Sequence, residues 1–93
     1  MVVGLVVWEL HIPGCASLKD KRQVVKGLKD RLHARFNVSA AETAHQDLLQ
    51  RAEMAVCVVS NDRRHAQSVL SAADELVMAE GRARIVDSYT TFY

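Results

Sequence analysis

Six polar side chains of types that bind metal ions or transfer protons are the ones we expect to converge near the predicted sheet. They are Glu9, His11, Glu42, His45, Asp47 and Glu53. Imidazole and carboxylate groups ligate divalent metals, or act as general acids and bases, only when the fold brings them within bonding distance. Their separations match no compact metal-binding motif, and no residue lies in a nucleophile elbow. The sequence therefore predicts no metal, no cofactor and no catalytic residue. A small-molecule enzyme stays a third alternative, which requires a pocket joining His11, Glu42 and His45.

Basic side chains are concentrated between Ser17 and Phe36, which contain seven of the twelve Lys and Arg residues. At about 100° per residue on a helix, one contiguous stripe carries Lys19, Arg22, Lys26, Lys29 and His33. One interpretation is a solvated helix face. The other is contact with nucleic-acid phosphates, which cations at this spacing follow without reading sequence. Arg51 joins the stripe as a candidate nucleic-acid-binding residue, and aromatic residues are too few to predict base stacking.

The segment from Ser60 to Arg64 has two interpretations. Asp62 offers a side-chain oxygen that caps the start of a helix. The positive end of that helix, together with Arg63 and Arg64, would instead attract an anion, although the carboxylate of Asp62 opposes it. Both interpretations stay open, and Arg63 and Arg64 are the candidate anion-binding residues.

The polar segment 45–53 surrounds two leucines and is also open to two interpretations. As a structural loop, it would use Leu48 and Leu49 to cover the end of the fold. As a recognition loop, it would present Arg51 to a phosphate or a carboxylate.

Length and composition indicate a single folded domain over residues 1–93. Hydrophobic residues make up 49% of the chain and charged residues 25%, and the formal net charge is +1. The opening apolar run is too short for a membrane span and lacks the features of a signal peptide. We therefore expect a cytoplasmic protein that does not contact membranes. Cys15 and Cys57 lack paired-motif spacing, so we expect inert thiols, although the sequence does not exclude a disulfide between them.

Apolar periodicity and turn signals predict six elements that must position these side chains. The predicted strands are Val2–Ile12, Phe36–Thr43, Ala52–Val59 and Arg82–Phe92, and the predicted helices run from Ser17 to about Arg35 and from about Asp62 to Gly81. Ser17 and Asp20 have the pattern of a capping box at the start of the first helix. Leu18, Val25, Leu28 and Leu32 form the apolar stripe of that helix beside its basic stripe.

The order β-α-β-β-α-β predicts an α+β ferredoxin-like sandwich, in which right-handed crossovers place both helices on one face of an antiparallel sheet. The first and third strands are almost continuously apolar, so they are the central strands and the strand order is four, one, three, two. Val3, Leu5 and Val7 then lie on the face without helices. We expect that face to be covered by a second copy in a homodimer, with a partner protein as the alternative.

Several short blocks, in order along nearly the whole chain, resemble the YlxP-like bacterial family, a domain of unknown function. These blocks are His11–Pro13, Ser17–Arg22, Arg35–Ser39, Asp47–Ala52 and Val59–Asp62. The resemblance implies a small ferredoxin-like domain and supplies no catalytic residues. Genes of that family often lie among bacterial translation genes, which implies association with RNA or the ribosome. The resulting hypothesis is a non-enzymatic RNA- or ribosome-associated module. A homodimeric structural or protein-interaction domain is the alternative.

Overall fold

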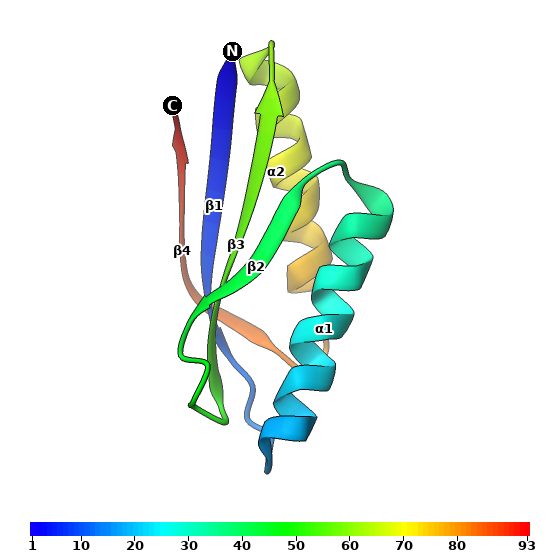
Figure 1. The fold of residues 1–93 in the computed structure, drawn as a ribbon, viewed down its shortest axis with the longest axis vertical. Coiled ribbons are helices and arrows are strands. Elements are labelled where there is room, and N and C mark those ends of the chain that lie inside the picture. The colour runs from blue at the N-terminus through cyan, green and yellow to red at the C-terminus, as the bar shows by residue number, and fades with distance from the viewer.

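The computed structural model describes every residue from Met1 to Tyr93 and contains four strands and two helices (Figure 1). In chain order these are β1 (Val2–His11), α1 (Leu18–Arg35), β2 (Ser39–Ala44), β3 (Arg51–Ser60), α2 (Arg63–Met78) and β4 (Arg84–Phe92). The predicted order β-α-β-β-α-β is therefore confirmed. Neither helix combines the length and the apolar character that crossing a bilayer requires.

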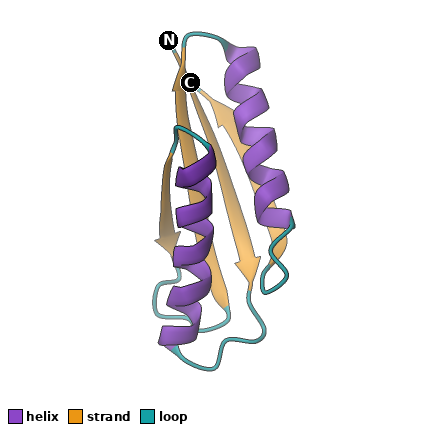
Figure 2. Ribbon diagram, turned by 90° about the vertical axis from the view of Figure 1, so that its right-hand side faces the viewer, coloured by secondary structure: helices purple, strands orange, loops and turns teal.

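The four strands form one antiparallel sheet in the order β2-β3-β1-β4, with the two apolar strands in the centre as predicted. Both helices lie on the same face of this sheet (Figure 2). Alternate side chains of the central strands, such as Val6, Trp8 and Leu10 of β1, point toward the helices and are buried. The other face of the sheet carries no helix.

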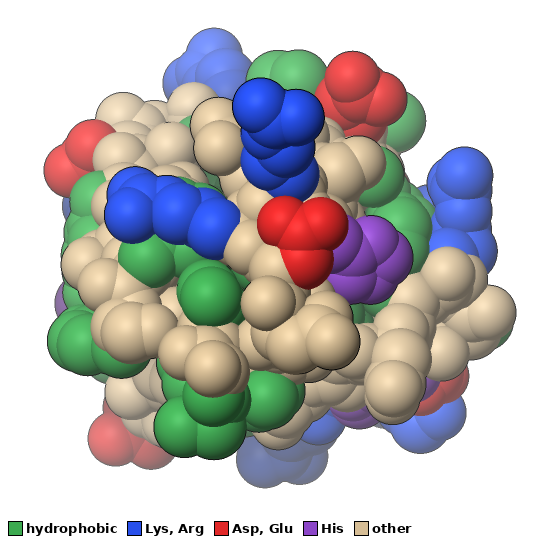
Figure 3. All heavy atoms as spheres, turned by 90° about the horizontal axis from the view of Figure 1, so that it is seen from above, with side chains coloured by type: hydrophobic (Ala, Val, Ile, Leu, Met, Phe, Trp, Pro, Cys, Tyr) green, Lys and Arg blue, Asp and Glu red, His purple; other side chains and the backbone are tan.

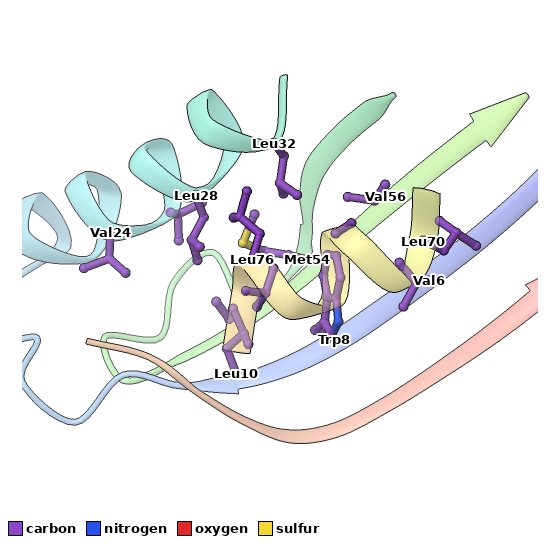
Figure 4. Close-up of a cluster of buried hydrophobic side chains, with 14 of the residues drawn as sticks. Val6, Trp8, Leu10, Val24, Leu28, Leu32, Met54, Val56, Leu70 and Leu76 are labelled. Carbon is purple, nitrogen blue, oxygen red and sulfur yellow. The ribbon is translucent and has the colours of Figure 1, made fainter. Parts of the chain in front are cut away.

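The core lies between the helices and the sheet and is built from apolar side chains of β1, β3, α1 and α2 (Figure 4). Trp8 is fully buried, and its indole Nε1–H donates a hydrogen bond to Asp74 Oδ1 of α2 at 2.8 Å. Gly4 leaves room for this packing, because a Cβ atom there would lie 3.0 Å from Leu70 Cδ1. The core thus fixes α2 against the centre of the sheet.

The largest differences from the sequence-based predictions concern the start of β2, the end of α2 and the buried stripe of α1. The strand predicted from Phe36 begins only at Ser39, because the Phe36 N–H still bonds to the Leu32 carbonyl at the end of α1. Helix α2 ends at Met78 rather than Gly81. Leu18 is 37% exposed, and Val24 takes its place in the buried stripe.

One of the two interpretations of segment 45–53, in which Leu48 and Leu49 cover the end of the fold, does not fit their exposure. They are 47% and 37% exposed and lie in the turn between β2 and β3.

Candidate nucleic-acid interface

Helix α1 starts where the capping pattern predicts. Ser17 is the N-cap, and its Oγ accepts a hydrogen bond from the Asp20 N–H at 3.1 Å. Asp20 Oδ2 in turn accepts from the Ala16 N–H at 3.3 Å, so the two side chains satisfy donors on both sides of the first turn. From this start, α1 buries Val25, Leu28 and Leu32 and leaves the basic stripe outside.

The basic stripe borders an open groove between α1 and the edge strand β2. The groove has a volume of about 420 Å³ and is lined by Arg22, Val25, Lys26, Lys29, Asp30, His33 and Glu42. Four of these seven side chains carry or can carry positive charge. Lys26 Nζ pairs with Asp30 Oδ2 at 2.8 Å, which holds the pKa of that carboxyl below its usual value. Lys19, Arg22 and Lys29 form no ion pair with any carboxylate.

Lys21 is the residue of this site that the sequence interpretation missed. It lies on α1 but is only 2% exposed, and its ammonium pairs with Glu42 Oε2 on β2 at 2.9 Å. It also donates a hydrogen bond to the backbone carbonyl of His45, a residue in the left-handed region with φ 64°. Glu42 Oε2 is buried and accepts no hydrogen bond, so Lys21 provides its compensation. The sequence contains a signal for the burial of Lys21. It precedes Val25 by four residues and Leu28 by seven, so helical periodicity places it on the buried face of α1.

Of the six polar residues considered for acid–base chemistry, only Glu9 and His45 pair with each other, and both lie outside the groove lining. His45 Nε2 lies 2.7 Å from Glu9 Oε1, and Arg51 donates to the same oxygen at 2.8 Å. Thr43 Oγ1 donates to Glu53 Oε1 at 2.7 Å. No hydrogen bond or ion pair joins His11 to Glu42 or His45, and no group of residues has the geometry of a metal site.

Arg51 is therefore half-exposed but already paired with Glu9 across the central strands. It lies on β3, apart from the groove-lining residues. Its assignment to nucleic-acid binding stays a prediction, as does that of the basic stripe of α1.

The start of α2 has the predicted cap. Asp62 Oδ1 accepts a hydrogen bond from the Arg64 N–H at 3.0 Å, and the Arg63 guanidinium lies 4.5 Å from the centre of the Phe92 ring. At the end of the molecule that carries both termini, basic, acidic and histidine side chains lie beside one another instead of forming a patch of one sign (Figure 3). The carboxylate of Asp62 occupies an amide that an anion would need. Anion binding by Arg63 and Arg64 stays a prediction.

A buried carboxylate connects the end of α2 to α1. Glu80 is 5% exposed and accepts hydrogen bonds from Arg82 at 2.9 Å and from Arg31 of α1. The Arg82 hydrogen bond is the largest cause that lowers the pKa of Glu80 to about 2, and the Arg31 hydrogen bond acts in the same direction. These contacts hold the loop before β4 against the helix that carries the basic stripe.

Val3, Leu5 and Val7 point to the face of the sheet without helices, as the strand pattern predicts. Val7 is 7% exposed and the other two are half-buried, whereas Val59 and Tyr89 on the same face are 67% and 60% exposed.

Cys15 and Cys57 are both free thiols, and burial raises the pKa of Cys15. The open alternative of a disulfide between them is therefore not realised. Cys15 is 3% exposed, as an inert structural cysteine is.

The chain is similar to proteins of unknown function and to a designed protein with ferredoxin fold. The model of the family described as "Protein of unknown function (DUF503)" matches residues 3–90. The chain is 35% identical over 69 residues to the uncharacterized protein YlxP of Bacillus subtilis (strain 168), covering 74% of this chain and 75% of YlxP.

The similar solved structures include two that cover nearly the whole chain. A de novo designed protein with ferredoxin fold has a TM-score of 0.54 and 15% identity, covering 100% of this chain and 83% of the design. SnoaB, a cofactor-independent oxygenase from Streptomyces nogalater, has a TM-score of 0.50 and 12% identity, covering 99% of this chain and 90% of SnoaB. At these identities the likeness shows the fold alone.

Proposed function

We propose a function for this chain, which belongs to the DUF503 family of proteins of unknown function. It is a non-enzymatic module that binds RNA through the groove between α1 and β2, either as free RNA or on the ribosome. The observation that carries this proposal is the gathering of Arg22, Lys26, Lys29 and His33 around one groove. Cations spaced one helical turn apart, about 5.4 Å, suit the succession of phosphates along a nucleic-acid backbone.

The charge of the groove supports an anionic partner despite the two carboxylates in its lining. Asp30 is paired with Lys26, and Glu42 is paired with Lys21, which approaches from the buried side of α1. Arg22 and Lys29 stay without an acidic partner, and Lys19 extends the same stripe by one turn. His33 lines the same groove.

The absence of aromatic side chains from the groove favours structured RNA over single-stranded RNA. Single-strand recognition uses aromatic side chains as stacking platforms, and duplex recognition uses shape and backbone contacts. The groove lining contains one apolar residue and no aromatic residue. A backbone-directed, sequence-tolerant contact with structured RNA therefore suits this surface.

The experiment is the salt dependence of binding to a short labelled RNA duplex, measured by fluorescence anisotropy. The three cations without a partner predict a slope of log affinity against log salt of about −2 to −3, at roughly 0.7 to 0.9 per phosphate contact. Reversing two of them, Arg22→Glu with Lys29→Glu, should reduce the steepness by about 1.5 to 2 and weaken binding uniformly across RNA sequences.

The matched control is Arg35→Glu with Arg84→Glu, which makes the same change in net charge at exposed positions outside the groove. Equal weakening by both double variants would mean that only net charge matters and would refute the groove. Co-sedimentation with ribosomal particles, with the same two variants, tests the ribosomal setting separately.

A second candidate function is a homodimeric structural or protein-interaction domain. It is favoured by the face of the sheet without helices, where the half-buried Val3 and Leu5 lie beside the exposed Val59 and Tyr89. Apolar side chains grouped on one face in this way are typical of surfaces that pack against a partner. Unchanged RNA affinity in the groove variant, together with self-association that Val59→Lys abolishes, would favour this alternative.

A further inference from the structure

The two edges of the sheet are protected to very different degrees. Edge strand β2 has six residues, contains Glu42, is irregular between Glu42 and Ala44, and lies beside α1. Edge strand β4 has nine residues, and its segment Ser88–Phe92 contains no charge, no proline and no irregularity of register. Short length, charges and bulges are the devices that keep edge strands from pairing with other chains. The β4 edge lacks them along five residues.

The backbone groups that β4 presents outward follow from its hydrogen bonds to β1. Val3 and Tyr93 exchange two backbone hydrogen bonds, at 3.0 and 2.8 Å. In an antiparallel pair such exchanges recur at every second residue, so Thr91 and Tyr89 also bond inward. The N–H and C=O groups of Ser88, Thr90 and Phe92 therefore point away from the sheet. Only the Ser88 N–H has a partner there, the Asp87 carboxylate at 2.9 Å.

A groove beside this edge carries opposite charges at its two ends. It has a volume of about 550 Å³ and lies between α2 and β4, with Ser88, Thr90 and Phe92 on the strand side. Arg63 lies over the Phe92 ring at one end. Asp74 accepts a hydrogen bond from Trp8, and Trp8 is the register partner of Ser88. Asp74 and its neighbour Glu75 therefore lie at the Ser88 end of the groove.

We propose that β4 pairs with β4 of a second copy, antiparallel and in the register that places Thr90 opposite Thr90 of the partner subunit. In this register Phe92 is opposite Ser88 of the partner subunit, because the two strands run in opposite directions from the central pair of Thr90 residues. The Arg63 end of one groove then faces the acidic end of the other, where Glu75 lies, so the charges are complementary in the two-fold arrangement. The two sheets join into one of eight strands, and the interface is isologous.

The first experiment removes the central hydrogen-bond donor. Thr90→Pro deletes an N–H that points away from β1, so the fold should be retained, as proline is tolerated on edge strands with the N–H facing solvent. Sedimentation equilibrium should give twice the 10.3 kDa chain mass for the wild type and for the control Thr90→Val, which keeps the N–H. Thr90→Pro should halve the mass and remove the concentration-dependent amide protection of Ser88 and Phe92 in hydrogen exchange.

The second experiment tests the register through charge and does not alter the strand. Arg63→Glu and Glu75→Arg should each weaken dimerisation, and the double variant should restore it because both changes are then complementary again. A wild type that stays monomeric at high concentration would overturn the proposal. So would a Thr90→Pro variant of unchanged mass, or a double variant no better than the singles. None of these readouts depends on RNA binding, so they are independent of the groove beside α1.

Discussion

Replacing Glu80 by glutamine should destabilise the protein by an amount that depends on pH. In the folded protein the pKa of Glu80 is about 2, compared with 4.5 for an unperturbed group, chiefly because Arg82 hydrogen-bonds to its carboxylate. At 1.36 kcal/mol per unit, this difference corresponds to at most about 3 kcal/mol of stability. Arg31 and Arg82 are 47% and 56% exposed, so water screens them, and we expect about 1 to 2 kcal/mol.

The sign of the pH dependence follows from the lowered pKa. A carboxyl group with a lower pKa in the folded state stabilises the protein fully above about pH 4.5, and this contribution disappears as the pH falls toward about 2. Urea unfolding followed by the fluorescence of Trp8, the one tryptophan of the chain, measures the free energy of unfolding at each pH. The difference between wild type and Glu80→Gln should be constant from pH 7 to 5 and should shrink below that.

Asp30→Asn is the matched control, because it also removes a carboxylate that is hydrogen-bonded to a basic side chain of α1. The Lys26–Asp30 pair is exposed on both sides, so its loss should leave the free energy of unfolding nearly unchanged. A Glu80→Gln difference that is the same at pH 7 and pH 2.5 would refute the electrostatic explanation and assign the effect to packing alone.

Two further predictions concern buried positions. Lys21→Met should lower the free energy of unfolding in urea by about 3 kcal/mol or more, because it leaves the Glu42 carboxylate buried without compensation. Adding Glu42→Gln should recover most of this loss. A double variant as unstable as Lys21→Met would contradict the pairing. Gly4→Ala should destabilise by about 1 to 2 kcal/mol, because its Cβ would lie 3.0 to 3.2 Å from atoms of Leu70, Phe92 and Val58. Gly81→Ala, where no atom lies within 4 Å, is its control, and equal effects would show that overpacking is not the cause.

Local signals in the sequence were sufficient for the order of the strands and the start of α1. The continuous apolar runs of β1 and β3 identify the central strands, and Ser17 marks the first helix because its side chain can reach the first-turn amide. Both depend on residues close in sequence. The end of α1 at Arg35 was also predicted, but α2 ends before the predicted Gly81 and β2 begins after the predicted Phe36. The Phe36 N–H bonds to the Leu32 carbonyl, a backbone contact that no side chain encodes.

The candidate site was harder to predict, because it depends on pairs that are distant in sequence. Lys21 and Glu42 are twenty-one residues apart and meet only when β2 packs beside α1. His45 pairs with Glu9 rather than with His11, because the turn after β2 takes a left-handed conformation and brings the imidazole over β1. Helical periodicity could have placed Lys21 in the buried stripe, but no pattern in the sequence names its partner.

The two proposed surfaces lie on opposite edges of the sheet, and this determines what a dimer would do. Pairing through β4 keeps all four helices on one face, so both basic grooves face the same side, with the two β2 strands about 34 Å apart at about 4.8 Å per strand interval. One structured RNA could then contact both grooves, and the second contact would be intramolecular. Pairing through the face without helices would instead turn the grooves to opposite sides, where they would bridge two separate partners. The three cations without acidic partners in each subunit are too few for tight binding alone. The surface used for self-association therefore decides whether the two sets of cations bind one RNA or two.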